Sequence, residues 1–106
     1  MNATPQPVRI DDLDRVIHER ARLAIMSALL AAGGEGTFVE LKSVVGLTDG
    51  NLSVHLRILG EAAYVSIVKS FVDRRPNTQV KVTAAGRRAF TTYLSVLEKI
   101  VKRGRR

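Results

Sequence analysis

The chain has 106 residues, of which 45% are hydrophobic and 25% are charged. These values are ordinary for a single globular domain, and no apolar run approaches the roughly 20 residues that a membrane-spanning helix needs. Cysteine is absent, which excludes disulfides, thiolate metal sites and thiol catalysis. The first residues show no basic stretch followed by an apolar one, so we expect no signal peptide and predict a cytoplasmic protein with no membrane partner.

Charge is divided unevenly along the chain, whose formal net charge is +7. Residues 1–61 carry six basic and eight acidic side chains, whereas residues 62–106 carry eleven basic and two acidic ones. A basic half favours a polyanionic partner, because neutralising phosphates releases their counterions. The alternative at this point is a solvated basic tail, since four of the basic residues lie at the carboxyl end.

The first predicted element is a helix over residues 13–32. Apolar residues recur there at three- and four-residue spacing, which is typical of an amphipathic helix. They are Leu13, Val16, Ile17, Leu23, Met26, Leu29 and Leu30. The glycines of residues 33–36 predict a turn after this helix, and residues 1–10, which contain two prolines, predict a flexible leader.

Two further helices are predicted between residues 37 and 61. Thr37 and Glu40 have the spacing of a capping box, and Gly46 is expected to end the short helix that follows them. Thr48 is a good N-cap for the next helix, which we expect to run to about Glu61. Its buried side is predicted to carry Leu52, Leu56 and Leu59.

From residue 64 the pattern becomes typical of strands. Residues 64–72 are rich in β-branched and aromatic residues, and residues 78–82 alternate between apolar and polar. The composition of residues 73–77 predicts a turn. The two runs therefore predict a β-hairpin with Arg74 and Arg75 at or near its tip. One face of the first run carries Val65, Ile67 and Phe71.

A last helix is predicted over residues 84–102, with Thr83 as its cap and residues 103–106 as a basic tail. It carries a wide apolar stripe, formed by Phe90, Tyr93, Leu94, Leu97, Ile100 and Val101. Monomers rarely leave such a patch exposed, so we predict an interface between these residues and the same helix of a second copy. The alternative is that the stripe packs wholly onto the helix around residues 23–30.

The order of these elements is helix, short helix, tight turn, helix, hairpin and long helix. This order predicts an α+β fold, mainly α: a winged helix-turn-helix with a two-stranded hairpin wing and a long C-terminal dimerisation helix. The helix-turn-helix would occupy residues 37–61 and the wing residues 64–82, within one domain over residues 11–102.

The helix after Thr48 is the candidate DNA-reading element, because the second helix of such a pair enters the major groove. Asn51 and Ser53 lie near its N-terminus, where free N–H groups and the helix dipole favour a phosphate. Arg57 has the donors to bond a guanine edge or a phosphate. The predicted reading surface is Thr48, Asn51, Ser53, Val54 and Arg57.

The stretch Gly-Leu-Thr-Asp-Gly-Asn-Leu-Ser at residues 46–53 is the most specific of several segments that look like a known family. Together with Thr-Ala-Ala-Gly-Arg at residues 83–87, it resembles the compact winged-helix regulators allied to the MarR and ArsR groups. The resemblance spans roughly residues 13–101. It implies a homodimer that binds a pseudo-palindromic operator in double-stranded DNA and regulates transcription. It also implies wing contacts from Arg74, Arg75 and Thr78.

Enzyme chemistry has no support in the sequence. There is no phosphate-binding glycine loop, no serine–histidine–acid arrangement and no metal-ligand cluster, so we expect no catalytic residue, metal or cofactor. Two other functions stay open: a winged-helix module that binds proteins, and a non-specific architectural DNA-binding protein. The sequence also leaves open a small apolar effector between the last helix and the core.

Overall fold

The computed structural model describes residues 9–104, so most of the predicted leader and the last two residues of the predicted tail lie outside the described residues. Three strands form one antiparallel sheet in the order β1-β3-β2. In chain order the elements are η1 (Ile10–Asp12), α1 (Arg20–Ala31), β1 (Glu35–Thr37), α2 (Phe38–Val45), α3 (Asp49–Glu61), β2 (Val65–Val72), β3 (Arg75–Val82) and α4 (Ala84–Gly104).

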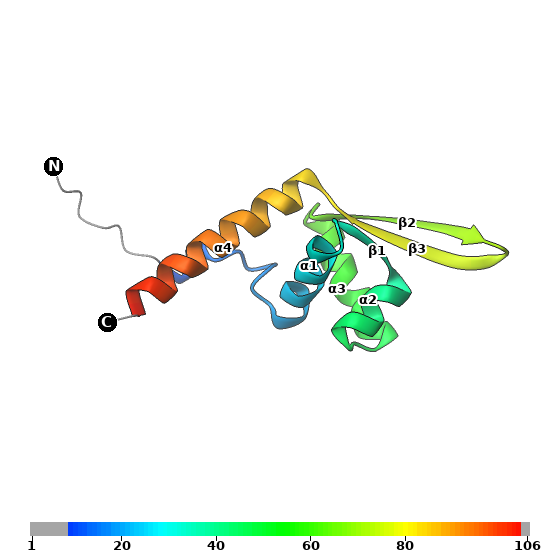
Figure 1. The fold of residues 1–106 in the computed structure, drawn as a ribbon, viewed down its shortest axis with the longest axis horizontal. Helices are drawn as coiled ribbons and strands as arrows, with labels where there is room; N and C mark the ends of the chain where they lie inside the picture. The colour runs from blue at the N-terminus through cyan, green and yellow to red at the C-terminus, as the bar shows by residue number, and fades with distance from the viewer. Residues whose placement is uncertain (1–8, 105–106) are drawn as a thin grey trace.

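Figure 1 shows three helices, α1 to α3, clustered in the middle of an elongated molecule. The β2–β3 hairpin projects from one end and α4 from the other. The predicted fold, a mainly α winged helix-turn-helix with a hairpin wing and a long last helix, is confirmed. The short strand β1, which pairs with β3 and widens the base of the hairpin to three strands, is an addition to it.

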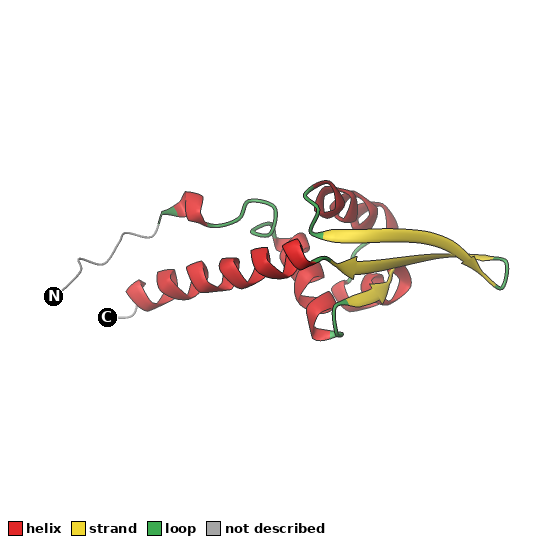
Figure 2. Cartoon of the chain, turned by 90° about the horizontal axis from the view of Figure 1, so that it is seen from above, coloured by secondary structure: helices red, strands yellow, loops and turns green. Residues whose placement is uncertain are grey.

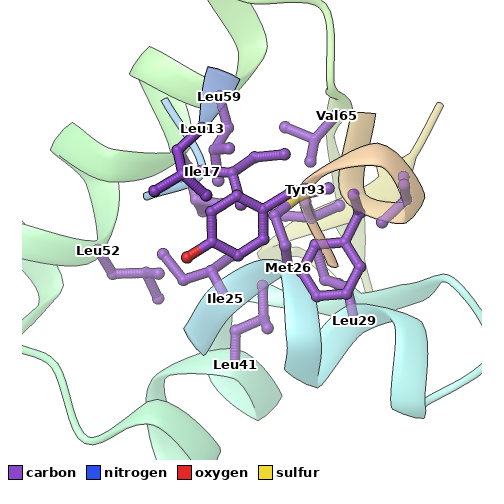
Figure 3. Packing of buried hydrophobic residues seen from close by; sticks show 14 residues of the cluster. Leu13, Ile17, Ile25, Met26, Leu29, Leu41, Leu52, Leu59, Val65 and Tyr93 are labelled. Carbon is purple, nitrogen blue, oxygen red and sulfur yellow. The ribbon is translucent and has the colours of Figure 1, made fainter. Parts of the chain in front are cut away.

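The hydrophobic core lies where α1, α2, α3, the base of the sheet and the first half of α4 meet. Figure 3 shows the Tyr93 ring in the middle of this cluster, with leucines of the three short helices around it. The three leucines predicted to face inward from α3 are all buried. This packing holds the back of α3 and leaves its other side to solvent.

Helix α1 begins at Arg20 rather than at Leu13, so the predicted start of this helix was wrong. The Asp14 carboxylate accepts hydrogen bonds from the backbone N–H groups two and three residues further on, at 2.8 and 3.0 Å. Such local bonds compete with a helix, and the extended residue Glu19 then caps α1. Leu13 and Ile17 are nevertheless buried. Their apolar spacing therefore indicated burial rather than helix.

The predicted caps of α2 and α3 are confirmed. The Thr37 hydroxyl accepts the N–H of Glu40 at 3.1 Å, and the Glu40 carboxylate accepts the N–H of Thr37 at 2.8 Å. This bond from the Thr37 backbone, with that of its side chain, holds the pKa of Glu40 below its usual value. Gly46 ends α2 in the left-handed conformation, and the Thr48 hydroxyl caps α3 by accepting the N–H of Asn51.

The hairpin turn is tighter than its composition suggested. Only Asp73 and Arg74 lie between the strands, with φ of 51° and 66°, as in the two-residue turns whose twist matches that of a hairpin. Arg75 and Pro76 belong to β3, so the predicted turn over residues 73–77 was too long. Pro76 is tolerated because it lies beyond the end of β1, where β3 is an edge strand.

Helix α3 ends in a left-handed residue, Ala63, whose φ is 64°. The N–H of Tyr64 bonds the carbonyl of Leu59 and the N–H of Ala63 bonds that of Gly60, at 3.0 and 2.9 Å. This is the Schellman geometry, in which glycine normally occupies the left-handed position. With alanine at this position, the left-handed backbone conformation is strained.

We expect Ala63→Gly to stabilise the protein by about 0.5–1 kcal/mol, because relief of the left-handed strain exceeds the entropy that glycine adds to the unfolded chain. The midpoint of thermal unfolding should rise by a few degrees, on the order of 2–6 °C. Ala62→Gly is the matched control, since Ala62 has a φ of −78° and should only lose stability. A fall in midpoint for both variants would contradict the argument.

Tyr64 joins the N-terminal segment to α4. Its hydroxyl donates to the Asp14 carboxylate, and this hydrogen bond, together with burial, raises the pKa of Tyr64 to about 12. Its carbonyl accepts the N–H of Thr83 at 3.0 Å, while the Thr83 hydroxyl caps α4 by accepting the N–H of Gly86 at 2.9 Å. A Cβ on Gly86 would overlap the Tyr64 carbonyl, so this close approach requires glycine.

Helix α4 is longer than predicted and ends at Gly104, so the first two residues of the expected tail are helical. Figure 2 shows it as a straight rod that extends beyond the body of the molecule, with the N-terminal segment on one side of it. Within residues 9–104, none of the helices combines the length and hydropathy needed to span a bilayer.

The apolar stripe of α4 is divided between two environments. Phe90 and Tyr93, predicted as interface residues, are only 8% and 2% exposed and belong to the core of the protomer. They therefore have little surface left for a second copy. Leu94 and Val101 are each 47% exposed, and the remaining two predicted residues, Leu97 and Ile100, are half-buried. The alternative, in which the whole stripe packs onto α1, does not hold for the second half of the stripe, because Leu94 and Val101 stay exposed.

Candidate nucleic-acid interface

Helix α3 is held against α1 by a polar cluster as well as by its leucines. The Arg22 guanidinium donates to the carbonyl of Val16 at 2.6 Å and to Nδ1 of His55 at 3.2 Å. Glu19 lies 3.7 Å from the same ring nitrogen. Burial alone would raise the pKa of Glu19, but the hydrogen bond from the backbone N–H of Arg22 and the charge of the Arg22 guanidinium lower it. His55 is thus tied to α1 behind the exposed face of α3.

All five residues of the predicted reading surface are exposed on α3 or at its cap. Thr48 and Asn51 lie at the N-terminal end, where the first free N–H groups of the helix point outward. Ser53, Val54 and Arg57 lie further along the helix and line an open groove of about 970 Å³ between α3 and the hairpin. The structure therefore divides the predicted set into a helix-end group and a groove group.

The hairpin forms the other wall of this groove. Thr78, one of the predicted wing residues, lines it together with Lys69, which pairs with Thr78 across the strands. Sequence reasoning missed Lys69. The signal was present in the alternation of β2, because Lys69 occupies the face of Val65 and Ile67 at the point where that face leaves the core.

Arg74 and Arg75 lie at the far end of the hairpin and not in the groove. Arg74 is in the turn and Arg75 begins β3, and both are exposed. A basic groove wall and a basic tip thus follow one another along the same hairpin, about 10 Å apart, because Lys69 lies three residues before the end of β2. This spacing suits a polyanion that passes along the hairpin.

Two acidic residues on α3 are paired rather than free. Asp49, in the first turn, forms an ion pair of 2.8 Å with Lys42 of α2. Glu61, at the last turn, lies 3.6 Å from Arg57. Both pairs are exposed, so each contributes little to stability. The Arg57–Glu61 pair is weak enough for the guanidinium to exchange this partner for a phosphate or a base.

We find no metal site among the described residues, because no three His, Cys, Asp or Glu side chains lie close enough together to hold an ion. A small cavity of about 320 Å³ lies between the N-terminal segment, Tyr64 and the first turns of α4. Its lining includes Asp11, Asp12, Asp14 and Arg88. This place corresponds to the expected effector site, but charged groups line it.

The structure combines two packed helices, α2 and α3, with a basic hairpin beside them, and α3 has an exposed polar face. This combination defines a winged helix-turn-helix protein of the nucleic-acid-binding kind. A family model described as a winged helix DNA-binding domain matches residues 21–101. The chain belongs to this family.

The chain is also similar to individual proteins from other organisms. An uncharacterised protein of Methanocaldococcus jannaschii is 44% identical over 57 residues, which are 54% of this chain and 62% of that protein. A transcriptional regulator homologue from Pyrococcus horikoshii OT3 is 30% identical with a TM-score of 0.81, over 88% of this chain and 91% of that one.

BpsR of Bordetella bronchiseptica, whose DNA binding is regulated by 6-hydroxynicotinic acid, has a TM-score of 0.70 at 16% identity, over 88% of this chain and 69% of that one. At this identity the likeness shows the fold alone. Other structures with the fold are regulators of the MarR and ArsR families. The resemblance to compact winged-helix regulators allied to these groups is confirmed.

Proposed function

We propose that the protein is a homodimeric transcriptional regulator that binds specific sequences in double-stranded DNA. The observation that carries the proposal is the groove between α3 and the basic hairpin, because it brings the exposed face of the recognition helix and the wing to one surface. With α3 in the major groove, one sugar–phosphate strand would cross the groove in the protein, and the hairpin would reach the adjacent minor groove.

The roles of the side chains follow from their chemistry. Thr48 and Asn51, at the N-terminus of α3, bind a phosphate or the nearest base edge together with the free backbone N–H groups. Arg57 donates to a guanine edge, and Val54 supplies an apolar contact for a thymine methyl group. Lys69 and Thr78 contact the backbone that crosses the groove. Arg74 and Arg75 bind phosphates at the edge of the minor groove.

In this proposal, two copies associate through the distal half of α4. Leu94 and Val101 are exposed on α4, a helix that extends beyond the body of the protomer (Figure 2), and Ile10 is exposed on the N-terminal segment. An isologous contact between two such surfaces would remove them from water. Two recognition helices would then face successive major grooves about one DNA turn apart.

The most direct test is selection of bound duplexes from a random pool, with the full chain as bait. We expect enrichment of an inverted repeat whose half-sites are about 10 base pairs apart. Binding without enrichment of any sequence would favour the architectural alternative. Failure to shift any duplex at low salt would favour the protein-binding module.

We expect Arg57→Ala to lower the ratio of specific to random-DNA affinity by about 5- to 150-fold, because it removes a base-edge contact worth about 1–3 kcal/mol. Lys69→Ala should instead weaken binding to all sequences alike and reduce the salt slope by about one. Fluorescence anisotropy with the selected duplex and a scrambled one, over a range of salt, measures both quantities. An unchanged ratio for Arg57→Ala would remove its base-reading role.

A small effector between the last helix and the core stays a prediction. The cavity at this place is lined by three carboxylates and a guanidinium, and also by Tyr64, Ala89, Thr92 and Tyr93. Such a mixed lining suits a molecule with both an apolar body and a polar group.

A further inference from the structure

The end of the hairpin exposes a large apolar side chain that the contacts proposed above do not use. Phe71 is 75% exposed, although an aromatic ring gains free energy from leaving water. Its partner across the strands is Pro76, which is also exposed. These two side chains form an apolar point, which is separated from the turn by one residue pair, Val72 and Arg75.

The strand register places this point on the side of the hairpin that faces α3. Side chains two apart along a strand share a face, so Phe71 follows Ile67 and Lys69, both of which line the groove with α3. Pro76 likewise follows Thr78 on the partner strand. Phe71 therefore lies about 7 Å beyond Lys69 on the same surface. Val72, its exposed neighbour, points to the opposite face.

The surroundings of Phe71 are basic. Lys69 precedes it on the same face, and Arg74 and Arg75 follow it at the tip, against one acidic residue, Asp73. An apolar side chain surrounded by cations suits a polyanion whose interior is apolar. Duplex DNA is such a partner, because its stacked bases lie between two rows of phosphates. A protein partner would need an acidic rim around an apolar pocket. Binding to such a partner would not explain why Phe71 lies on the same surface as the groove beside α3.

We propose that Phe71, backed by Pro76, is an apolar wedge that enters the minor groove beside the major groove occupied by α3 and kinks the duplex there. Apolar side chains that partly unstack a base step bend DNA by about 20–90°. The eight paired residues of each strand fix the position of the wedge relative to α3. This inference rests on the proposed function and extends it.

The wedge adds sequence preference without a hydrogen bond to a base. Pyrimidine–purine steps such as TA and CA/TG open more easily than other steps. The sequences selected by the wild-type chain should therefore carry such a step at a fixed distance outside the part read by α3. Selection with Phe71→Thr should yield the same α3 half-site with that step no longer enriched.

The test measures bending on a 40-base-pair duplex that contains the selected sequence and carries a fluorophore at each end. Wild-type protein should shorten the end-to-end distance, and 2-aminopurine placed at the predicted step should brighten as it unstacks. Phe71→Thr keeps a good strand former but removes the ring. We expect it to abolish the bend and the brightening and to weaken binding on the order of tenfold. Val72→Thr, the same kind of change on the opposite face, should alter neither.

Each result decides between the wedge and its rivals. Equal bending by wild type and Phe71→Thr, or a straight duplex in the wild-type complex, would overturn the wedge and leave DNA binding intact. Weaker self-association of Phe71→Thr with an unchanged bend would identify the tip as a contact between copies and also overturn it. No binding by wild type to any duplex would remove the proposed function itself, and the wedge with it. Thermal unfolding of the variants verifies that both remain folded.

Discussion

The double substitution Leu94→Glu and Val101→Glu is expected to convert the proposed dimer into a monomer. The two side chains are seven residues apart on one face of α4 and each is 47% exposed, so carboxylates there remain solvated in the protomer. In the dimer they would be buried opposite their own copies, without partners, at a cost of several kcal/mol. The change should therefore act on association and leave folding intact.

Loss of the dimer should weaken binding to a two-half-site duplex by about 10²- to 10⁴-fold, because the second recognition helix no longer binds as part of the same molecule. Binding to a single half-site should change little. Sedimentation velocity gives the oligomeric state, and anisotropy with one- and two-site duplexes gives the affinities.

Val39→Glu with Val44→Glu is the matched control for association, because both residues are exposed on α2 and the same charge is added. This control should remain dimeric. A wild-type protein that sediments as a monomer at concentrations where it fills a two-site duplex would refute the interface on α4.

Gly86→Ala is expected to destabilise the protein by about 2–4 kcal/mol. The added Cβ would overlap the carbonyl oxygen of Tyr64 and lie 3.0–3.1 Å from two further backbone atoms of that residue. Backbone at this place cannot yield easily, because the same carbonyl accepts the N–H of Thr83. The loss is a large fraction of the roughly 5–15 kcal/mol that stabilises a typical domain, and should lower the unfolding midpoint by about 10 °C or more.

The matched control for this substitution is Gly50→Ala. Gly50 is also helical, but an added Cβ there meets nothing within 4 Å, so the change should be neutral or stabilise by up to about 1 kcal/mol. Urea denaturation of the two variants gives both free energies of unfolding. Equal stability of Gly86→Ala and wild type would show that α4 can shift away from Tyr64 at little cost.

The elements that the sequence predicted well have local causes. The capping box at Thr37 and the caps at Thr48 and Thr83 each depend on a bond within three residues. The hairpin followed from the alternation of its strands. Because these signals are complete within one stretch of chain, they indicated the order of the helices and the hairpin, and the exposed face of α3, from sequence alone.

The errors arose where a pattern had two physical meanings. The apolar spacing around Leu13 and Ile17 indicated a helix, yet the Asp14 carboxylate stabilises a turn there and the two side chains are buried without a helix. The apolar stripe on α4 predicts a contact with a second copy, because monomers rarely leave so wide a patch exposed. The core accepts Phe90 and Tyr93, so only the distal half stays available.

Local patterns in the sequence are enough to predict the elements of a winged helix, with an exposed polar face on α3 and a basic hairpin after it. Periodicity, caps and charge are properties of neighbouring residues, so they can be recognised without knowledge of the fold. Which side chains meet across the fold depends on the packing of distant segments. This packing places Lys69 of the hairpin and Arg57 of α3 on one groove, aligns Phe71 with that surface and requires a glycine where α4 crosses Tyr64. These contacts depend on strand register and helix packing, which no single stretch of sequence specifies.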